Sequence, residues 1–273
     1  MSLCLLLWGL LTAQAHAQDA VRGAEVAALA GCAACHTTEG GAPYAGGHAL
    51  WTPFGIFYGP NLTQSTEHGL GDWRLDDFEL ALRHGRSPEG RPYFPSFPYT
   101  SYAHLSDADV RDLWVFLQTI PADERVEEPH ELSGITGFRF MVRLWKLIYF
   151  RPYQELHDPD LSEAWNRGAY LANGPAHCGE CHTPRDSLGG LDHDQWLAGS
   201  NLPPEFAPNI TPTGVGDWSE AELASYLLDG EDPDGVPAGR GMARVIARGT
   251  SRLSDADRSA IATYIASLPR RGR

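Results

Sequence analysis

The pentapeptides Cys32-Ala-Ala-Cys35-His36 and Cys178-Gly-Glu-Cys181-His182 share the pattern Cys-x-x-Cys-His. This spacing is typical of the covalent attachment of a c-type haem. Two thiols on one helical turn can both reach the vinyl groups of one porphyrin, and the histidine that follows then lies beneath the iron as its proximal ligand. A single copy is also compatible with a zinc or redox motif, but two copies in similar surroundings favour haem attachment.

The two pentapeptides lie within a longer internal repeat. Three further segments return in the same order and at nearly constant spacing: Pro60-Asn-Leu-Thr63 as Pro208-Asn-Ile-Thr211, Gly71-Asp-Trp73 as Gly216-Asp-Trp218, and Leu105-Ser-Asp-Ala-Asp109 as Leu253-Ser-Asp-Ala-Asp257. Such regularity indicates one domain that is present twice. The sequence therefore predicts a dihaem c-type cytochrome with two covalently attached haem c groups.

Each copy of the repeat is predicted to be helical. Residues 72–84 place apolar side chains on one helical face, and residues 218–228 repeat the pattern. Ser106 and Ser254 are good N-caps for a later helix in each copy. Long Gly- and Pro-rich loops separate these helices, so each copy has few apolar side chains with which to build a core. We therefore expect each copy to need the haem as its core.

The domain organisation follows from the repeat. We predict an all-α chain of two tandem class I cytochrome c domains, residues 18–121 and 161–273, joined by a linker at residues 122–160. Residues 138–150 of the linker are apolar and aromatic with interspersed Arg and Lys, which predicts a short amphipathic helix. This helix either packs against both haem domains, which we favour because it is short, or contacts a membrane or a partner subunit.

The N-terminal segment resembles a signal peptide over residues 1–17. Leu3 to Leu11 form an apolar run, and Ala15-His16-Ala17 matches a small-x-small cleavage site. The run is too short to span a bilayer, although an uncleaved anchor is the alternative because no Lys or Arg precedes it. Since haem is attached to cytochromes c after export, we expect a periplasmic protein, with membrane association as the alternative.

The composition excludes some classes of binding partner and of enzyme. The 273-residue chain has 35 acidic and 21 basic residues, a net charge of −14, which argues against nucleic acid and anionic lipid as partners. The sequence shows no paired carboxylates, Ser-His-Asp arrangement, phosphate-binding loop or nicotinamide fingerprint. The chemistry is therefore expected to be that of the cofactor.

The chain resembles the cytochrome c subunits of bacterial periplasmic dehydrogenases of the alcohol and gluconate type. The resemblance covers nearly all of the mature chain. It rests on Thr52-Pro-Phe-Gly55, Gly59-Pro-Asn-Leu-Thr63, Asp77-Phe78, Arg83-His-Gly85, Phe94-Pro-Ser-Phe-Pro-Tyr99, Cys178–Thr183, Pro208–Thr211 and the region of Met242. Those subunits carry three haem motifs, and this chain has two. The resemblance implies a periplasmic dehydrogenase subunit as partner and a downstream electron acceptor.

The proximal side of each haem is predicted with its supporting residues. His36 and His182 are the expected proximal iron ligands. The carbonyl groups of Pro60 and Pro208 are expected to hold the two imidazole rings. Two arginines that precede the motifs either neutralise haem propionates or lie at solvated helix starts: Arg22 and Arg167.

The distal side is expected to differ between the copies. Met242 lies where a cytochrome c fold brings its distal methionine to the iron, with a buried core methionine as the alternative. In the first copy the equivalent loop holds Phe97, where the resemblance implies a ligand methionine, and a phenyl ring cannot bind iron. The sequence does not decide the distal ligand of haem 1. Either the iron is open or bound by water, or one of three weak candidates binds it: His104, His84 or His48.

Electron transfer is the expected function. The chain is predicted to relay single electrons from a dehydrogenase partner to a terminal oxidase or a soluble acceptor, as a non-catalytic subunit of an oxidoreductase complex. The alternative is a dihaem redox enzyme, of the thiosulfate dehydrogenase or peroxidase type, that uses a haem 1 iron without a methionine ligand. The spin state of haem 1 distinguishes the two.

Overall fold

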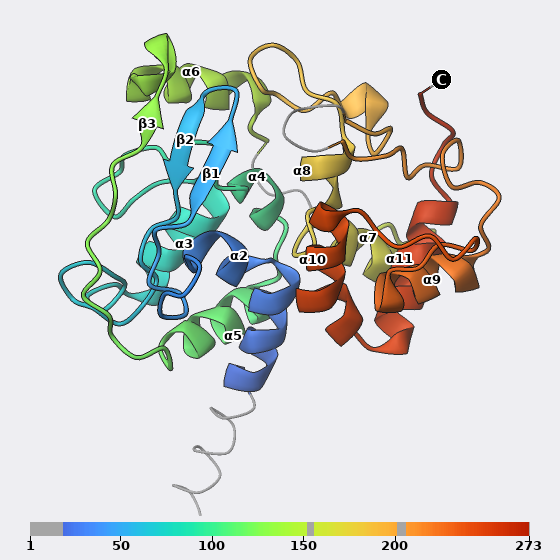
Figure 1. Ribbon diagram of the computed structural model, residues 1–273, viewed down its shortest axis with the longest axis horizontal. Helices are drawn as coiled ribbons and strands as arrows, with labels where there is room; N and C mark the ends of the chain where they lie inside the picture. The colour runs from blue at the N-terminus through green and yellow to red at the C-terminus, as the bar shows by residue number, and fades with distance from the viewer. Residues whose placement is uncertain (1–18, 152–155, 201–205, 273) are drawn as a thin grey trace, which may run out of the picture.

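The computed structural model describes residues 19–151, 156–200 and 206–272. The predicted signal peptide lies outside these residues. Within them the chain is mostly helical, and the two copies of the repeat form the blue-to-green and the yellow-to-red halves of Figure 1. No helix among the described residues is long and apolar enough to cross a bilayer.

The first copy is built from a helical segment at residues 19–29 and four further helices. These are α2 (Cys32–His36), α3 (Leu75–His84), α4 (Tyr99–Tyr102) and α5 (Asp107–Leu117). Helix α3 ends at Gly85, whose φ of 54° is the left-handed conformation that favours glycine. Helix α5 begins at the predicted N-cap, because the Ser106 side chain accepts a hydrogen bond from the backbone nitrogen of Asp109.

The second copy repeats this order with one longer element. Its elements are α7 (Glu163–Asn173), α8 (Cys178–His182), η2 (His193–Gln195), α9 (Glu220–Asp229), α10 (Arg240–Arg248), η3 (Thr250–Arg252) and α11 (Asp255–Ala266). Ser254 caps α11 by accepting from the backbone nitrogen of Asp257, as Ser106 caps α5. Between α9 and α11 stands the nine-residue α10, where the first copy has only the four-residue α4.

A glycine at the crossing of the first and last helices is common to both copies. A Cβ on Gly23 would lie 1.9 Å from the carbonyl oxygen of Asp112, and one on Gly168 would lie 1.9 Å from that of Ala260. The arginine before each glycine pairs with a carboxylate of the closing helix, Arg22 with Asp112 and Arg167 with Asp257. These ion pairs therefore join the first and last helices of each copy where they cross.

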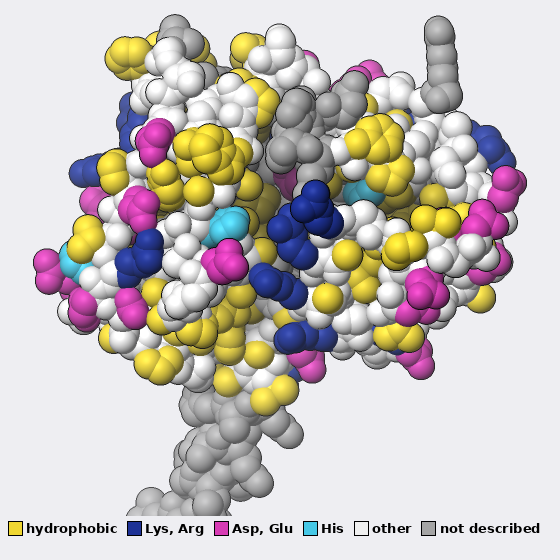
Figure 2. Space-filling view, in the orientation of Figure 1, with side chains coloured by type: hydrophobic (Ala, Val, Ile, Leu, Met, Phe, Trp, Pro, Cys, Tyr) yellow, Lys and Arg dark blue, Asp and Glu magenta, His cyan; other side chains and the backbone are white. Residues whose placement is uncertain are grey.

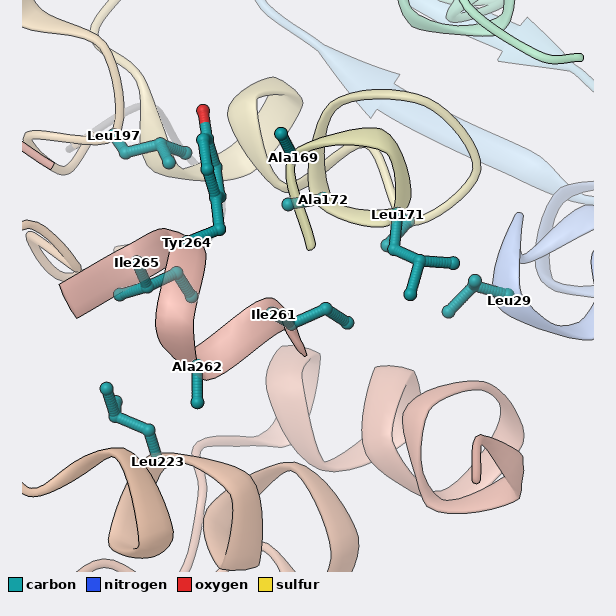
Figure 3. Packing of buried hydrophobic residues seen from close by; sticks show 11 residues of the cluster. Leu29, Ala169, Leu171, Ala172, Leu197, Leu223, Ile261, Ala262, Tyr264 and Ile265 are labelled. Atoms are coloured by element: carbon teal, nitrogen blue, oxygen red, sulfur yellow. The ribbon is translucent and has the colours of Figure 1, made fainter. Parts of the chain in front are cut away.

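Each copy has its own hydrophobic core, and the two cores meet. In the second copy, Leu171 of α7 and Ile261 of α11 belong to one buried cluster with Leu223 of α9 (Figure 3). Leu29, from the helical segment that opens the first copy, belongs to the same cluster. The first copy's N-terminal helix therefore packs into the core of the second copy.

A small antiparallel sheet corrects the all-α prediction. Strands β1 (Ala49–Thr52) and β2 (Gly55–Tyr58) form a hairpin, and β3 (Glu131–Leu132) adds to β2 in the order β1-β2-β3. The Thr52 hydroxyl donates to the carbonyl of Gly55 at 2.9 Å and closes the turn. The strands are short, and β3 comes from a distant part of the chain. The sequence therefore has no alternating apolar and polar pattern that would predict the sheet.

Helix α6 (Arg139–Tyr149) lies between the copies and follows η1 (Gly134–Gly137). The Lys146 ammonium donates to the carbonyl of Gly85 in the first copy at 3.1 Å, and the Trp145 indole donates to the carbonyl of Leu188 in the second copy at 3.0 Å. The opposite side of α6 exposes four apolar side chains: Phe140, Leu144, Leu147 and Ile148. One side of the helix therefore touches both copies, and the other is free of them.

Candidate haem-binding sites

The two Cys-x-x-Cys-His segments form one helical turn each, α2 and α8. Each turn is entered through a left-handed residue, Gly31 at φ 64° and His177 at φ 39°, and is followed by an extended threonine. None of the four cysteines of these turns forms a disulfide with a described residue. This geometry leaves both thiols of each turn available for thioether bonds to one porphyrin.

The environment of the thiols argues against a redox or zinc motif. Burial raises the pKa of Cys32 and of Cys178 to about 12. Redox-active cysteines instead have a lowered pKa, because the thiolate is the reactive form. Among the described residues no group of three or more His, Cys, Asp or Glu side chains is arranged to hold a metal ion. The raised pKa values of Cys32 and Cys178 disfavour a reactive dithiol.

The proximal histidines are held as the sequence predicts. The Nδ1 atom of His36 lies 2.8 Å from the carbonyl oxygen of Pro60, and that of His182 lies 2.8 Å from the carbonyl oxygen of Pro208. A carbonyl can only accept, so Nδ1 carries the proton and Nε2 keeps its lone pair. Burial lowers the pKa of both histidines, which favours the neutral imidazole that binds iron.

The Pro-Asn-x-Thr segments position these carbonyls. The side-chain oxygen of Asn61 accepts from the backbone nitrogen of Thr63 at 2.9 Å, and that of Asn209 accepts from Thr211 at 2.8 Å. The Asn61 amide also donates to the carbonyl of Asp123, at the end of the copy. Each asparagine thus ties the proline turn to the chain that closes its domain. The repeat of Pro-Asn in the sequence was the signal for this role.

The residues that precede the two attachment turns are in contact although the sequence separates them widely. The carbonyl of Ala30, just before α2, accepts from the Tyr102 hydroxyl at 2.8 Å and lies 3.2 Å from Nε2 of His177, just before α8. Burial and the proximity of Cys181 raise the pKa of Cys35. The two motifs therefore meet through Ala30 and His177, the residues just before them.

Glu180, inside the second motif, links the two copies. Its carboxylate accepts from the hydroxyls of Thr100 at 2.8 Å and Ser101 at 3.0 Å, both on α4 of the first copy, and it pairs with Arg185. Burial alone raises the pKa of Glu180, but Arg185 and Thr100 outweigh it, so the net pKa is lowered. The buried carboxylate is thus ionised, a role that sequence reasoning missed.

The residues at the two predicted distal positions lie in different surroundings. Met242 lies in the first turn of α10, one turn before the buried Ile246 and hence on the same helical face. In the first copy Phe97 packs edge-on against three tyrosine rings: Tyr93, Tyr99 and Tyr102. The position equivalent to the methionine is therefore filled by an aromatic cluster.

The three weak histidine candidates lie in different places. His48 accepts through its carbonyl from Gly59, next to the proline that holds His36, and its charge helps to lower the pKa of His36 after the larger effect of burial. It thus lies with the proximal segment. His84 is exposed at the end of α3, and the carbonyl of His104 lies near Gly174 of the second copy. The distal ligand of haem 1 stays a prediction.

The chain belongs to the cytochrome c family, whose family model matches residues 20–121 and 166–269. It is 45% identical over 258 residues to a diheme cytochrome c-type protein of Cereibacter sphaeroides, covering 92% of this chain and 86% of that protein. The match to both repeats and to a diheme relative shows that the chain binds two covalently attached haem c groups.

Two further relatives are subunits of dehydrogenases. The chain is 39% identical to the fructose dehydrogenase cytochrome subunit of Gluconobacter japonicus, with 94% of this chain and 54% of the relative covered. It is 36% identical to the cytochrome c subunit of a quinone-type alcohol dehydrogenase of Gluconobacter oxydans, with 93% and 57% covered. The chain spans a little over half the length of these two relatives.

Proposed function

We propose that this chain is a periplasmic electron-transfer cytochrome that takes single electrons from a dehydrogenase subunit and passes them to a terminal oxidase or a soluble acceptor. Residues 18–121 and 161–273 would form two haem domains, joined by the linker at 122–160, after removal of residues 1–17. The observation that carries the proposal is the contact between Ala30 and His177, the residues just before the two attachment turns, because it would bring two one-electron centres into the same part of the molecule.

The proposal gives each site residue a role. Cys32 and Cys35 bind the first porphyrin and His36 its iron; in the second copy these roles fall to Cys178, Cys181 and His182, with Met242 as the distal ligand. When bound, the haem supplies the one-electron iron couple. The contact of each Nδ1 with a proline carbonyl would leave Nε2 of the histidine free to bind the iron. A thioether ligand favours ferrous iron, so Met242 makes the second site the more oxidising one.

Transfer from the first site to the second then runs downhill. Spectroelectrochemical titration of the purified, exported protein tests this directly. We expect two one-electron steps at distinct potentials and two haems per chain. One step, one haem per chain or a colourless mature protein would contradict the proposal.

A redox enzyme is the second candidate function, and Phe97 is the observation that favours it. A first site without a methionine leaves its iron open to a small molecule unless another side chain binds there. Low-temperature electron paramagnetic resonance separates the cases. A high-spin, cyanide-sensitive signal from haem 1 indicates an enzyme, and two low-spin signals indicate a carrier.

The outer face of α6 stays a predicted contact with a membrane or a partner subunit. Its inner face is occupied by both copies, and the dehydrogenase relatives named above are themselves subunits of larger enzymes.

A further inference from the structure

His177, the residue before the second attachment motif, has a strained backbone. Its φ of 39° lies in the left-handed region, which is unfavourable for a residue with a Cβ. The repeat places Gly31 at the equivalent position of the first copy, at φ 64°, and glycine adopts this conformation without steric cost. The second copy therefore carries a histidine where the backbone favours glycine. Residues held in such conformations cluster at functional sites, which directs attention to the His177 side chain.

The His177 side chain reaches into the first copy. Its Nε2 atom lies 3.2 Å from the carbonyl oxygen of Ala30, and because a carbonyl only accepts, Nε2 is the donor. Ala30 closes the helical segment before α2, so its carbonyl is one of the last of a helix and takes its donor from outside. Ala30 is buried, and a buried carbonyl that lacks a donor destabilises the fold. The histidine thus supplies a hydrogen bond that the other copy needs.

Helix α4 of the first copy supplies a second donor to the same carbonyl. The Tyr102 hydroxyl donates to Ala30 at 2.8 Å, and the rings of Tyr102 and His177 meet edge-on with their centroids 5.7 Å apart. Two other hydroxyls of α4 donate to the Glu180 carboxylate in α8. Helix α4, which lies between α2 and α8 in Figure 1, therefore contacts the segments of both attachment turns. We call Ala30, Tyr102 and His177 the carbonyl joint.

The carbonyl joint belongs to a packed contact between the copies. Leu29, next to Ala30, is buried in the hydrophobic cluster of the second copy. On the face seen in Figure 2 the side chains of the two halves meet along their boundary, where hydrophobic side chains lie beside a column of Lys and Arg side chains. Apolar packing is non-directional, whereas a hydrogen bond has a preferred geometry. The hydrogen bonds of the joint are therefore the contacts that orient one attachment turn against the other.

We propose that His177 is a positioning residue, which fixes the second attachment turn against the first and so sets the spacing and orientation of the two haems. The inference rests on the proposed function, because it concerns the exchange of electrons between the haems. Electron transfer between two centres slows steeply as their separation grows. A second turn that is free to change its orientation would therefore make transfer between the copies slower. The cross-copy contact of His177 offsets the strain in its backbone.

The test replaces His177 by glycine, the residue at the equivalent position of the first copy. His177→Gly relieves the backbone strain and removes the donor. We expect the variant to keep two haems per chain with unchanged potentials. Pulsed dipolar electron paramagnetic resonance of the oxidised holoprotein should show a broader distribution of iron–iron distances than in the wild type. After laser-flash reduction, electrons should equilibrate between the two haems several-fold more slowly.

Two further variants separate the hydrogen bond from the fold. His177→Gln places an amide donor where Nε2 lies and should restore the wild-type distances and rate. Tyr102→Phe removes the other donor of the joint but keeps the ring, and should broaden the distances less than His177→Gly does. Tyr93→Phe is its matched control, because Tyr93 and Tyr102 both pack edge-on against Phe97. This control should change neither the distances nor the rate.

A second control addresses the loss of a histidine as such. His193 is exposed and stacks on Trp196 within the second copy, so His193→Gly should leave the iron–iron distances unchanged. Wild-type distances in His177→Gly, equal broadening in His193→Gly, or a His177→Gln variant that behaves like His177→Gly would each overturn the inference. The proposed function fails separately, if the wild type holds its two irons at a fixed distance but passes no electron between them.

Discussion

The two copies of the repeat hold the predicted proximal histidine in the same way but differ at the position predicted for the distal ligand. In both copies a proline carbonyl lies 2.8 Å from the histidine. Phe97 lies in an aromatic cluster in the first copy, whereas Met242 lies on helix α10 in the second. The proximal half binds the cofactor, and the distal half sets what the iron does. A duplicated domain can therefore keep its attachment chemistry while its two potentials diverge.

The largest expected effect comes from removing a proximal ligand. His182→Ala should lower the haem content from two per chain toward one and destabilise the second copy, because the porphyrin is its interior. Haem-to-protein ratio and thermal unfolding measure both effects. His193→Ala, at an exposed histidine, is the matched control. A variant that keeps two haems and full stability would show that the two copies do not share a proximal design.

Exchange of the distal residues should move the two potentials in opposite directions. Met242→Leu is expected to leave the haem attached and to lower its potential on the order of 0.1 V, within the ~0.8 V that axial ligands span. Phe97→Met should raise the potential of haem 1. Spectroelectrochemical titration measures both shifts. An unchanged potential in Met242→Leu would remove that residue from the ligand set, and the distal contrast with it.

The smallest of these effects concerns the contact between the copies. Glu180→Gln should destabilise the protein by about 1–3 kcal/mol at neutral pH, because it leaves the Arg185 charge without its partner. The lowered pKa of Glu180 means that its contribution is complete above the ordinary pKa of glutamate and is lost as the pH falls through the folded-state value. The difference from wild type should therefore shrink on acidification.

Denaturant unfolding of both proteins at neutral pH and at about pH 3 measures this difference. Glu163→Gln, at an exposed glutamate of α7, is the control. A gap between wild type and Glu180→Gln that stays constant with pH would mean that the carboxylate is not ionised in the folded protein.

Local chemistry made much of the molecule predictable. Short motifs predict three kinds of feature correctly, because their geometry is set within a few residues or by the repeat. These are the attachment turns, the serine N-caps of α5 and α11, and the proline carbonyls that contact His36 and His182. Helix α3 begins at Leu75, three residues after the predicted start, because Arg74 is its N-cap.

Long-range contacts made the rest unpredictable. The pairing of β3 with β2 joins distant segments, and the all-α prediction missed it. From the sequence, Glu180 is expected to face solvent between two cysteines. In the structure α4 of the first copy covers it. The distal partner of His36 could not be read from the sequence either, because several side chains can bind iron and only the folded loop decides among them.

The packing of Leu29 has a consequence for the separability of the halves. This side chain of the first copy is 7% exposed and completes the core of the second. A fragment that begins at α7 would expose to water the apolar side chains that Leu29 covers. A fragment that ends before α7 would expose Leu29 itself. The repeated unit can be recognised twice in the chain, but each half would expose apolar surface if it were separated from the other.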